Sequence, residues 1–174
     1  MEISKRLSYN ALIKYIFLIR HAETDSTNDN ALKGDPPLSE KGKKNAELAG
    51  KYLQSNDIDA IYASPFERTR QTAEIIKNTL GKKISLLEDH NLREKMEYVL
   101  SPFDNFEDFL KEWCKTLYNR KYKPVQGDSS IDTGNRYEQV IQSIPSKFNK
   151  IVIVGHGGGI ADLIRNLVEL GVFD

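Results

Sequence analysis

Two runs of apolar residues give the chain its clearest pattern, and each has the length of a buried strand. They cover residues 15–20 and 150–156, where Ile, Val, Leu and Phe fill most positions. Continuous apolar runs of this length are typical of strands in a parallel sheet that is covered on both faces. Residues 58–63 and 83–88 carry shorter runs of the same kind, so we expect them to be strands as well.

Apolar residues at helical spacing fill the segments between these runs. One helix is predicted to begin after Ser39, whose side chain suits an N-cap. The next is predicted to begin with "SPFERTRQTAEIIKNTL" at residues 64–80, with Pro65 near its first turn, and to close at Gly81. Later helices are predicted over residues 105–118, 131–144 and 157–171. The first of these places Phe106, Phe109 and Leu110 on one packed apolar stripe, and the second places Tyr137 on an apolar face. This alternation of strands and helices predicts an α/β fold, a three-layer α/β/α sandwich around a mainly parallel sheet.

Composition limits the classes of function. The chain has 174 residues, and its 25 basic and 25 acidic residues cancel, so its overall charge favours neither nucleic acid nor an anionic membrane as a partner. No apolar run approaches the roughly 18–20 residues that span a bilayer. The single cysteine, Cys114, rules out an internal disulfide and fits a cytoplasmic setting. We interpret residues 1–14 as an N-terminal extension without signal-peptide features and residues 15–174 as one domain.

The two most apolar strands both end on a histidine, His21 and His156. In a parallel sheet, the carboxyl ends of neighbouring strands meet at one edge, which is where sites form. Arg20 adds a planar cation that suits phosphate oxygens. Gly157 opens a run of three glycines before a helix, whose N-terminus favours an anion. Together these features indicate a phosphate site.

Other interpretations have less support. A single histidine at a strand end is usually structural or solvated, and we expect His90 to be a surface residue. We expect Ser64 to cap or support its loop. The stretch "GHGGG" resembles an esterase oxyanion motif, but the chain has no G-x-S-x-G nucleophile motif, and the stretch does not fit G-x-G-x-x-G. Histidines and acids lack the clustered spacing of metal ligands, so we expect no metal and no cofactor.

Five motifs in order resemble those of the histidine phosphatase (phosphoglycerate mutase-like) superfamily, and the resemblance runs from about residue 15 to the end. They are "LIRHAET", "GDPPLSEKGKKNA", "ASPFERTRQTAEII", "LRE" at residues 92–94, and "VGHGGGI". The resemblance implies that His21 is a nucleophile that carries a transient phosphohistidine. It also implies that Glu94 is the proton donor, and Glu88, Asp89 and Glu97 are the nearby acids that compete for this role. Phosphoryl oxygens would be held by Arg20, Arg68, His156, Gly157 and Asn28, the last standing one place beyond the usual asparagine.

The departures from the family motifs bear on activity. The segment after "LRE" reads Lys95-Met96-Glu97-Tyr98 where an aromatic-glycine pair is usual, so the acid loop is atypical. Residues 95–135 form a modest lid or insertion, shorter than that of the mutases, and a more open pocket favours hydrolysis. Members of the superfamily usually continue into a further strand, and two expectations stay open for a chain that stops at "ELGVFD": either "GVFD" begins that strand, or this edge strand is missing.

We therefore predict a metal-independent phosphatase of small phosphomonoesters, with a small-molecule phosphoester as its partner and neither nucleic acid nor membrane bound. Two alternatives stay open. One is mutase-type phosphoryl transfer, and the other is a non-catalytic module that binds phosphorylated ligands, which the atypical acid loop and the early C-terminus suggest. The sequence leaves the oligomeric state open, with a homodimer as one option.

Overall fold

The computed structural model describes residues 15–27, 34–98, 102–103 and 105–169. Its sheet has four parallel strands in the order β1-β4-β2-β3. The strands are β1 (Tyr15–Arg20), β2 (Ala60–Ala63), β3 (Ser85–Glu88) and β4 (Lys150–Gly155). The two apolar strands that end on histidines are therefore direct neighbours, with β4 in the interior of the sheet.

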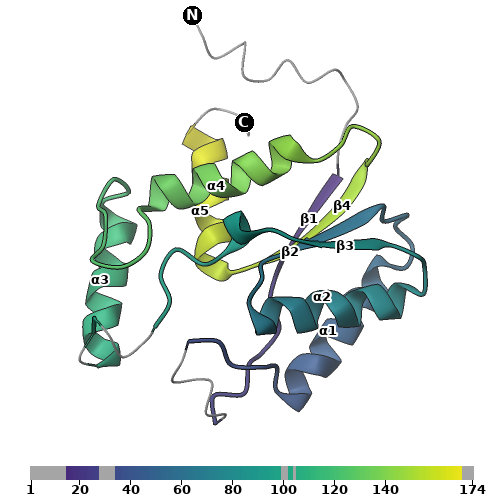
Figure 1. Cartoon of the computed structure of the whole chain (residues 1–174), viewed down its shortest axis with the longest axis horizontal. Helices are drawn as coiled ribbons and strands as arrows, with labels where there is room; N and C mark the ends of the chain where they lie inside the picture. Colours follow the sequence, from purple (N-terminus) through teal and green to yellow (C-terminus); the bar gives the residue numbers. More distant parts are fainter. Residues whose placement is uncertain (1–14, 28–33, 99–101, 104, 170–174) are drawn as a thin grey trace, which may run out of the picture.

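Helices cover both faces of the sheet, which confirms the predicted three-layer α/β/α sandwich. Figure 1 shows α1 and α2 on one side of the strands and α4 and α5 on the other. The helices are α1 (Glu40–Leu53), α2 (Glu67–Leu80), α3 (Phe106–Tyr118), α4 (Ser130–Ser143) and α5 (Gly157–Glu169), with a short 3-10 helix at His90–Leu92.

Strand β4 contributes side chains to the hydrophobic cores on both faces of the sheet. Side chains of successive strand residues point to opposite faces. Ile151 and Ile153 pack against α4 and α5 in one core, while Val152 and Val154 join α1 and α2 in the other. All four side chains are fully buried. The lack of polar alternation in this strand is therefore a direct consequence of burial on both faces.

Local signals set most helix ends. The Ser39 hydroxyl accepts a hydrogen bond from the N–H of Gly42 and caps α1 as predicted. Gly81 ends α2 in the left-handed conformation, with φ of 63°, as predicted. The predicted start of α2 was too early, because Phe66 is extended and acts as the N-cap, so Pro65 precedes the helix.

The segment that contains α3 lies at one end of the molecule (Figure 1). We predicted that its apolar residues would form a packed stripe, and this is correct for Phe109, which is buried with Met96 and Phe103. Phe106 and Leu110 are exposed instead. The predicted end of the last helix at Gly171, and the question of a missing strand after it, lie outside the described residues.

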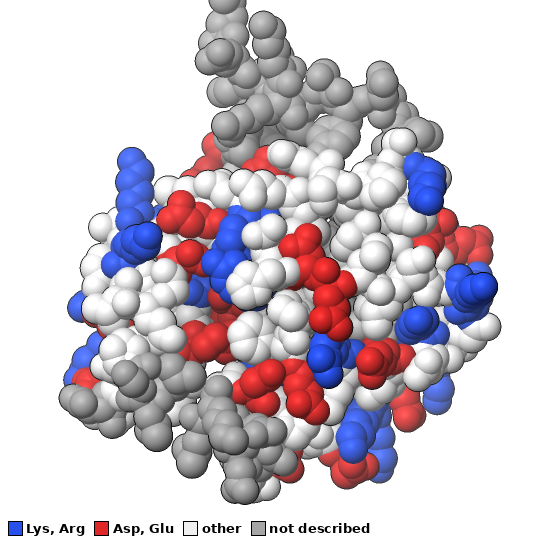
Figure 2. All heavy atoms as spheres, viewed as in Figure 1, with Lys and Arg blue, Asp and Glu red and all other residues white. Residues whose placement is uncertain are grey.

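Acidic and basic side chains are interspersed on the face seen in Figure 2, as the balanced composition suggests. Within the described part of the chain, no helix is both long and apolar enough to cross a membrane.

Candidate active site

The carboxyl ends of β1, β4 and β2 bring three polar side chains together. The backbone N–H of His21 donates to the carbonyl of Gly155, one residue before His156. The N–H of Ser64, the first residue after β2, donates to the carbonyl of Val154. His21 and Ser64 therefore flank His156 from both neighbouring strands. The predicted adjacency of the two histidines is confirmed, with ring centroids 5.4 Å apart.

The hydrogen bonds of His21 define its tautomer. Its Nδ1 lies 2.9 Å from the carbonyl oxygen of Ala22, which can only accept, so Nδ1 carries the proton. The Nε2 atom is left with a free electron pair. Burial lowers the pKa of His21 to about 4, with further lowering by Arg68 and Arg20, although the bond to Ala22 opposes this. The imidazole is therefore neutral near pH 7, as a nucleophile requires.

His156 has the opposite tautomer. Its Nδ1 lies 3.3 Å from Nη2 of Arg68, which can only donate, so Nδ1 accepts. Its Nε2 then donates to the hydroxyl of Ser64 at 2.9 Å. Burial, followed by the charge of Arg68, lowers the pKa of His156 to about 2, so this ring also stays neutral. The Ser64 hydroxyl can itself donate or accept, so it can support either tautomer of His156.

Tyr137 on α4 fixes the backbone at His156. Its hydroxyl donates to the carbonyl of Leu92 at 2.7 Å and accepts from the N–H of His156 at 3.2 Å. The phenol packs so closely that a Cβ atom at Gly155 or Gly159 would come within 2.6 Å of it. One buried side chain thus joins the end of β4 to the segment that leads to Glu94.

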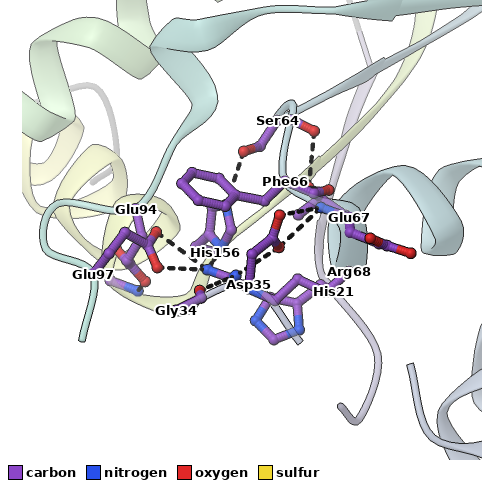
Figure 3. Close-up of polar contacts among 12 residues, drawn as sticks. His21, Gly34, Asp35, Ser64, Phe66, Glu67, Arg68, Glu94, Glu97 and His156 are labelled. Carbon is purple, nitrogen blue, oxygen red and sulfur yellow. Dashed lines mark hydrogen bonds and ion pairs between the residues drawn. The ribbon is translucent and has the colours of Figure 1, made fainter. Parts of the chain in front are cut away.

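Arg68, in the first turn of α2, is buried at the centre of the site (Figure 3). Its Nη1 donates to the carbonyl of Gly34 and to Asp35 at 2.9 and 3.2 Å. Its Nη2 contacts His156 and both carboxylate oxygens of Glu97, at 3.1 and 2.9 Å. The guanidinium therefore contacts His156, and protein groups occupy both of its outer nitrogens.

Glu94 lies against the N-terminus of α5. One carboxylate oxygen accepts the N–H of Lys95 and the other accepts the N–H of Gly158, each at 2.9 Å. Gly158 is needed here because a Cβ atom would lie 2.5 Å from the carboxylate. Burial raises the pKa of Glu94, and the two backbone bonds oppose that rise. A raised pKa suits a carboxyl group that has to donate a proton.

The structure describes three of the four remaining predicted residues. Arg20 is exposed, and its side chain passes 3.5 Å from the Cβ position of Gly157, so both face the same end of the sheet. Its charge also contributes to the lowered pKa values of both histidines. Asn28 lies outside the described residues. His90 is exposed, as expected for a surface residue.

Sequence reasoning missed three participants. Ser64 was interpreted as a residue that caps or supports its loop, although its place directly after a strand was a signal that it could meet His156. Glu97 was considered only as a competitor of Glu94 for the acid. Tyr137 was assigned to an apolar helix face, and its polar role has no signal in the local sequence. Among the described residues, no group of three or more His, Cys, Asp or Glu side chains is placed to hold a metal ion.

The carboxyl ends of the strands bring together two neutral histidines, two arginines and a buried carboxyl group. This combination is typical of a site that binds and transfers phosphoryl groups. Comparison with known families agrees: the model of the histidine phosphatase superfamily (branch 1) matches residues 16–172. The chain belongs to this superfamily.

Individual relatives include both phosphatases and mutases. The chain is 30% identical to the probable phosphoglycerate mutase GpmB of Yersinia enterocolitica over 164 residues, which cover 89% of this chain and 75% of the relative. The solved structure of Bacillus stearothermophilus YhfR has a TM-score of 0.71 and 27% identity, covering 88% of this chain and 79% of that one. A mycobacterial glucosyl-3-phosphoglycerate phosphatase shares the fold, with a TM-score of 0.67, 24% identity and coverage of 87% and 79%.

Proposed function

We propose that the protein is a phosphatase that hydrolyses small phosphomonoesters through a phosphohistidine on His21. The observation that carries this proposal is the His21–His156 pair beside Arg68, with a free Nε2 on His21. Solved phosphatases with the same fold, one acting on glucosyl-3-phosphoglycerate, support hydrolysis as the reaction. The lone cysteine also supports a cytoplasmic location.

In the first step, Nε2 of His21 attacks the phosphorus atom and the bond between phosphorus and the leaving oxygen breaks. Glu94 gives its proton to that oxygen, so the alcohol leaves uncharged. Arg20, Arg68 and the N–H of Gly157 at the start of α5 stabilise the charge on the other phosphoryl oxygens. The hydrogen bond from Nδ1 to Ala22 holds the ring in position and stabilises the positive charge it acquires.

In the second step, water attacks the phosphorus atom of the phosphohistidine. The Glu94 carboxylate, now ionised, takes one proton from that water, and the bond between Nε2 and phosphorus breaks. Inorganic phosphate leaves, and His21 and Glu94 return to their starting states. The residues described above supply every proton transfer in this cycle, so the proposed mechanism is independent of metal ions.

The direct test is hydrolysis of p-nitrophenyl phosphate in the presence of EDTA by the wild type and by His21→Ala. We expect turnover by the wild type that persists in EDTA, and a loss of at least about a thousandfold in the variant because the covalent route is gone. Rapid quenching should trap an acid-labile, base-stable phosphoryl group on the wild type. Equal turnover by both proteins would contradict the mechanism, and phosphate binding without turnover would support a non-catalytic module.

Phosphoryl transfer between positions of phosphoglycerate is the second candidate, because a probable phosphoglycerate mutase is among the relatives. A mutase returns the phosphoryl group to the bound product before water can take it. Assays with 3-phosphoglycerate should therefore follow 2-phosphoglycerate and inorganic phosphate at the same time. Formation of 2-phosphoglycerate that is much faster than phosphate release would favour this candidate.

A further inference from the structure

The Glu97 carboxylate accepts hydrogen bonds from Nη2 of Arg68, the arginine that is expected to hold phosphate. Both of its carboxylate oxygens lie within 3.1 Å of Nη2 of Arg68. The neighbouring Nη1 donates to Gly34 and Asp35. Figure 3 shows Glu97 beside Glu94, with Arg68 between the acids and His21. A phosphoryl oxygen that approaches Nη2 must therefore take the place of the Glu97 carboxylate.

The backbone just before Glu97 is anchored through Lys95. Lys95, two residues earlier, is fully buried and pairs with Asp162 of α5 at 3.1 Å. Its ammonium group also lies 4.6 Å from the centre of the Trp113 ring. The Lys95 carbonyl accepts the N–H of Asp128 at 2.9 Å. We therefore expect the Glu97 side chain to move when a phosphoryl oxygen takes its place at Arg68.

Two further carboxyl groups, those of Glu94 and Asp35, lie near Glu97. Burial raises its pKa to about 7, and repulsion from Glu94 and Asp35 adds to the rise, while Arg68 opposes it. Near pH 7 and above, a bound phosphoester therefore meets a substantially ionised Glu97. A substrate that brings another carboxylate to this place adds repulsion, whereas an uncharged alcohol does not.

We propose that Glu97 is a specificity-determining residue, which favours phosphomonoesters of uncharged alcohols and disfavours those whose alcohol carries a carboxylate. The hydroxyl groups of an uncharged alcohol can donate hydrogen bonds to the displaced Glu97 and replace part of what it loses at Arg68. A carboxylate offers acceptors alone and leaves Glu97 without a partner. This inference rests on the proposed phosphatase function and adds the substrate class to it.

Glycerol 3-phosphate and 3-phosphoglycerate form a matched pair. The carbon farthest from the phosphoester is a hydroxymethyl group in the first compound and a carboxylate in the second. We compare kcat/KM for both substrates at pH 8 in the wild type, in Glu97→Gln and in Glu47→Gln. The last variant removes the same charge from an exposed site on α1 and serves as the control. Dissociation constants for both ligands are measured by calorimetry on the same three proteins.

We expect the wild type to prefer glycerol 3-phosphate by at least about tenfold, the equivalent of about 1.4 kcal/mol. Glu97→Gln should reduce this preference about tenfold through a gain on 3-phosphoglycerate, and Glu47→Gln should keep it. The same preference in the wild type and in Glu97→Gln overturns the specificity inference while the phosphatase proposal stands. If p-nitrophenyl phosphate is not hydrolysed either, the phosphatase proposal fails, and the ratio of the dissociation constants decides whether Glu97 selects ligands.

Discussion

Replacement of Glu97 by glutamine should change how stability depends on pH. Folding raises the pKa of this carboxyl from 4.5 to about 7, mainly through burial. The folded state then binds the proton more tightly than the unfolded state. The stabilisation that Glu97 contributes is therefore complete below about pH 4.5 and is lost as the pH rises through 7. Glutamine resembles the neutral carboxyl and does not titrate.

The size of the effect follows from the two pKa values. At about 1.36 kcal/mol per unit, a difference of about 2.5 units corresponds to about 3 kcal/mol over the full range. Between pH 5 and pH 8 the same relation gives about 2.5 kcal/mol, and we expect about 2 because solvent screens part of the charge. The Glu97 side chain is 21% exposed, which makes this reduction small.

The assay is urea denaturation followed by circular dichroism at pH 5 and pH 8 for the wild type, Glu97→Gln and Glu47→Gln. The quantity of interest is the free energy of unfolding of each variant minus that of the wild type. This difference should rise by about 2 kcal/mol from pH 5 to pH 8 for Glu97→Gln and stay constant for Glu47→Gln. Contributions from His21 and His156 cancel, since every protein contains both. A difference that is independent of pH, or that falls, would refute the reasoning.

Four further predictions concern the site and the segment that supports it. With glycerol 3-phosphate, kcat/KM should decline below about pH 4, where His21 is protonated, and again at higher pH where Glu94 ionises. Glu94→Gln should lower this activity by about a hundredfold or more and abolish the decline at higher pH, with a smaller loss on p-nitrophenyl phosphate, whose leaving group needs no proton. Lys95→Met should cost about 3–5 kcal/mol in urea denaturation because it leaves the buried Asp162 without its ammonium partner, and Lys95→Met with Asp162→Leu should recover most of this. Gly158→Ala should reduce kcat by about tenfold or more, since its Cβ atom would displace the Glu94 carboxylate, and unchanged steady-state kinetics would contradict that placement.

The sequence was sufficient where local pattern and topology determine the outcome. Two apolar runs that end in histidine predict parallel neighbours, and the register that pairs Arg20 with Gly155 places the rings together. Ser39 and Gly81 predicted helix ends because caps depend on the residues beside them.

The contacts of Arg68 could not be predicted, because they depend on residues that lie far apart in the sequence. Glu97 reaches it from an irregular segment whose path depends on a buried pair between Lys95 and Asp162, which are 67 positions apart. No periodicity connects such positions. The start of α2 was misjudged because Pro65 can stand either inside a first turn or just before it, and only the extended conformation of Phe66 decides between them.

The close packing around Tyr137 restricts the order in which this part of the chain can change. Its ring leaves no space for a side chain at Gly155 or Gly159. A methyl group at either glycine is tolerated only after the ring has been replaced by a smaller side chain. That replacement by itself releases the N–H of His156 and the carbonyl of Leu92. Each single substitution at these three positions therefore disrupts the packing or the hydrogen bonds. Only combined substitutions at Tyr137 and a glycine can be tolerated, so a library that varies the positions one at a time would miss them.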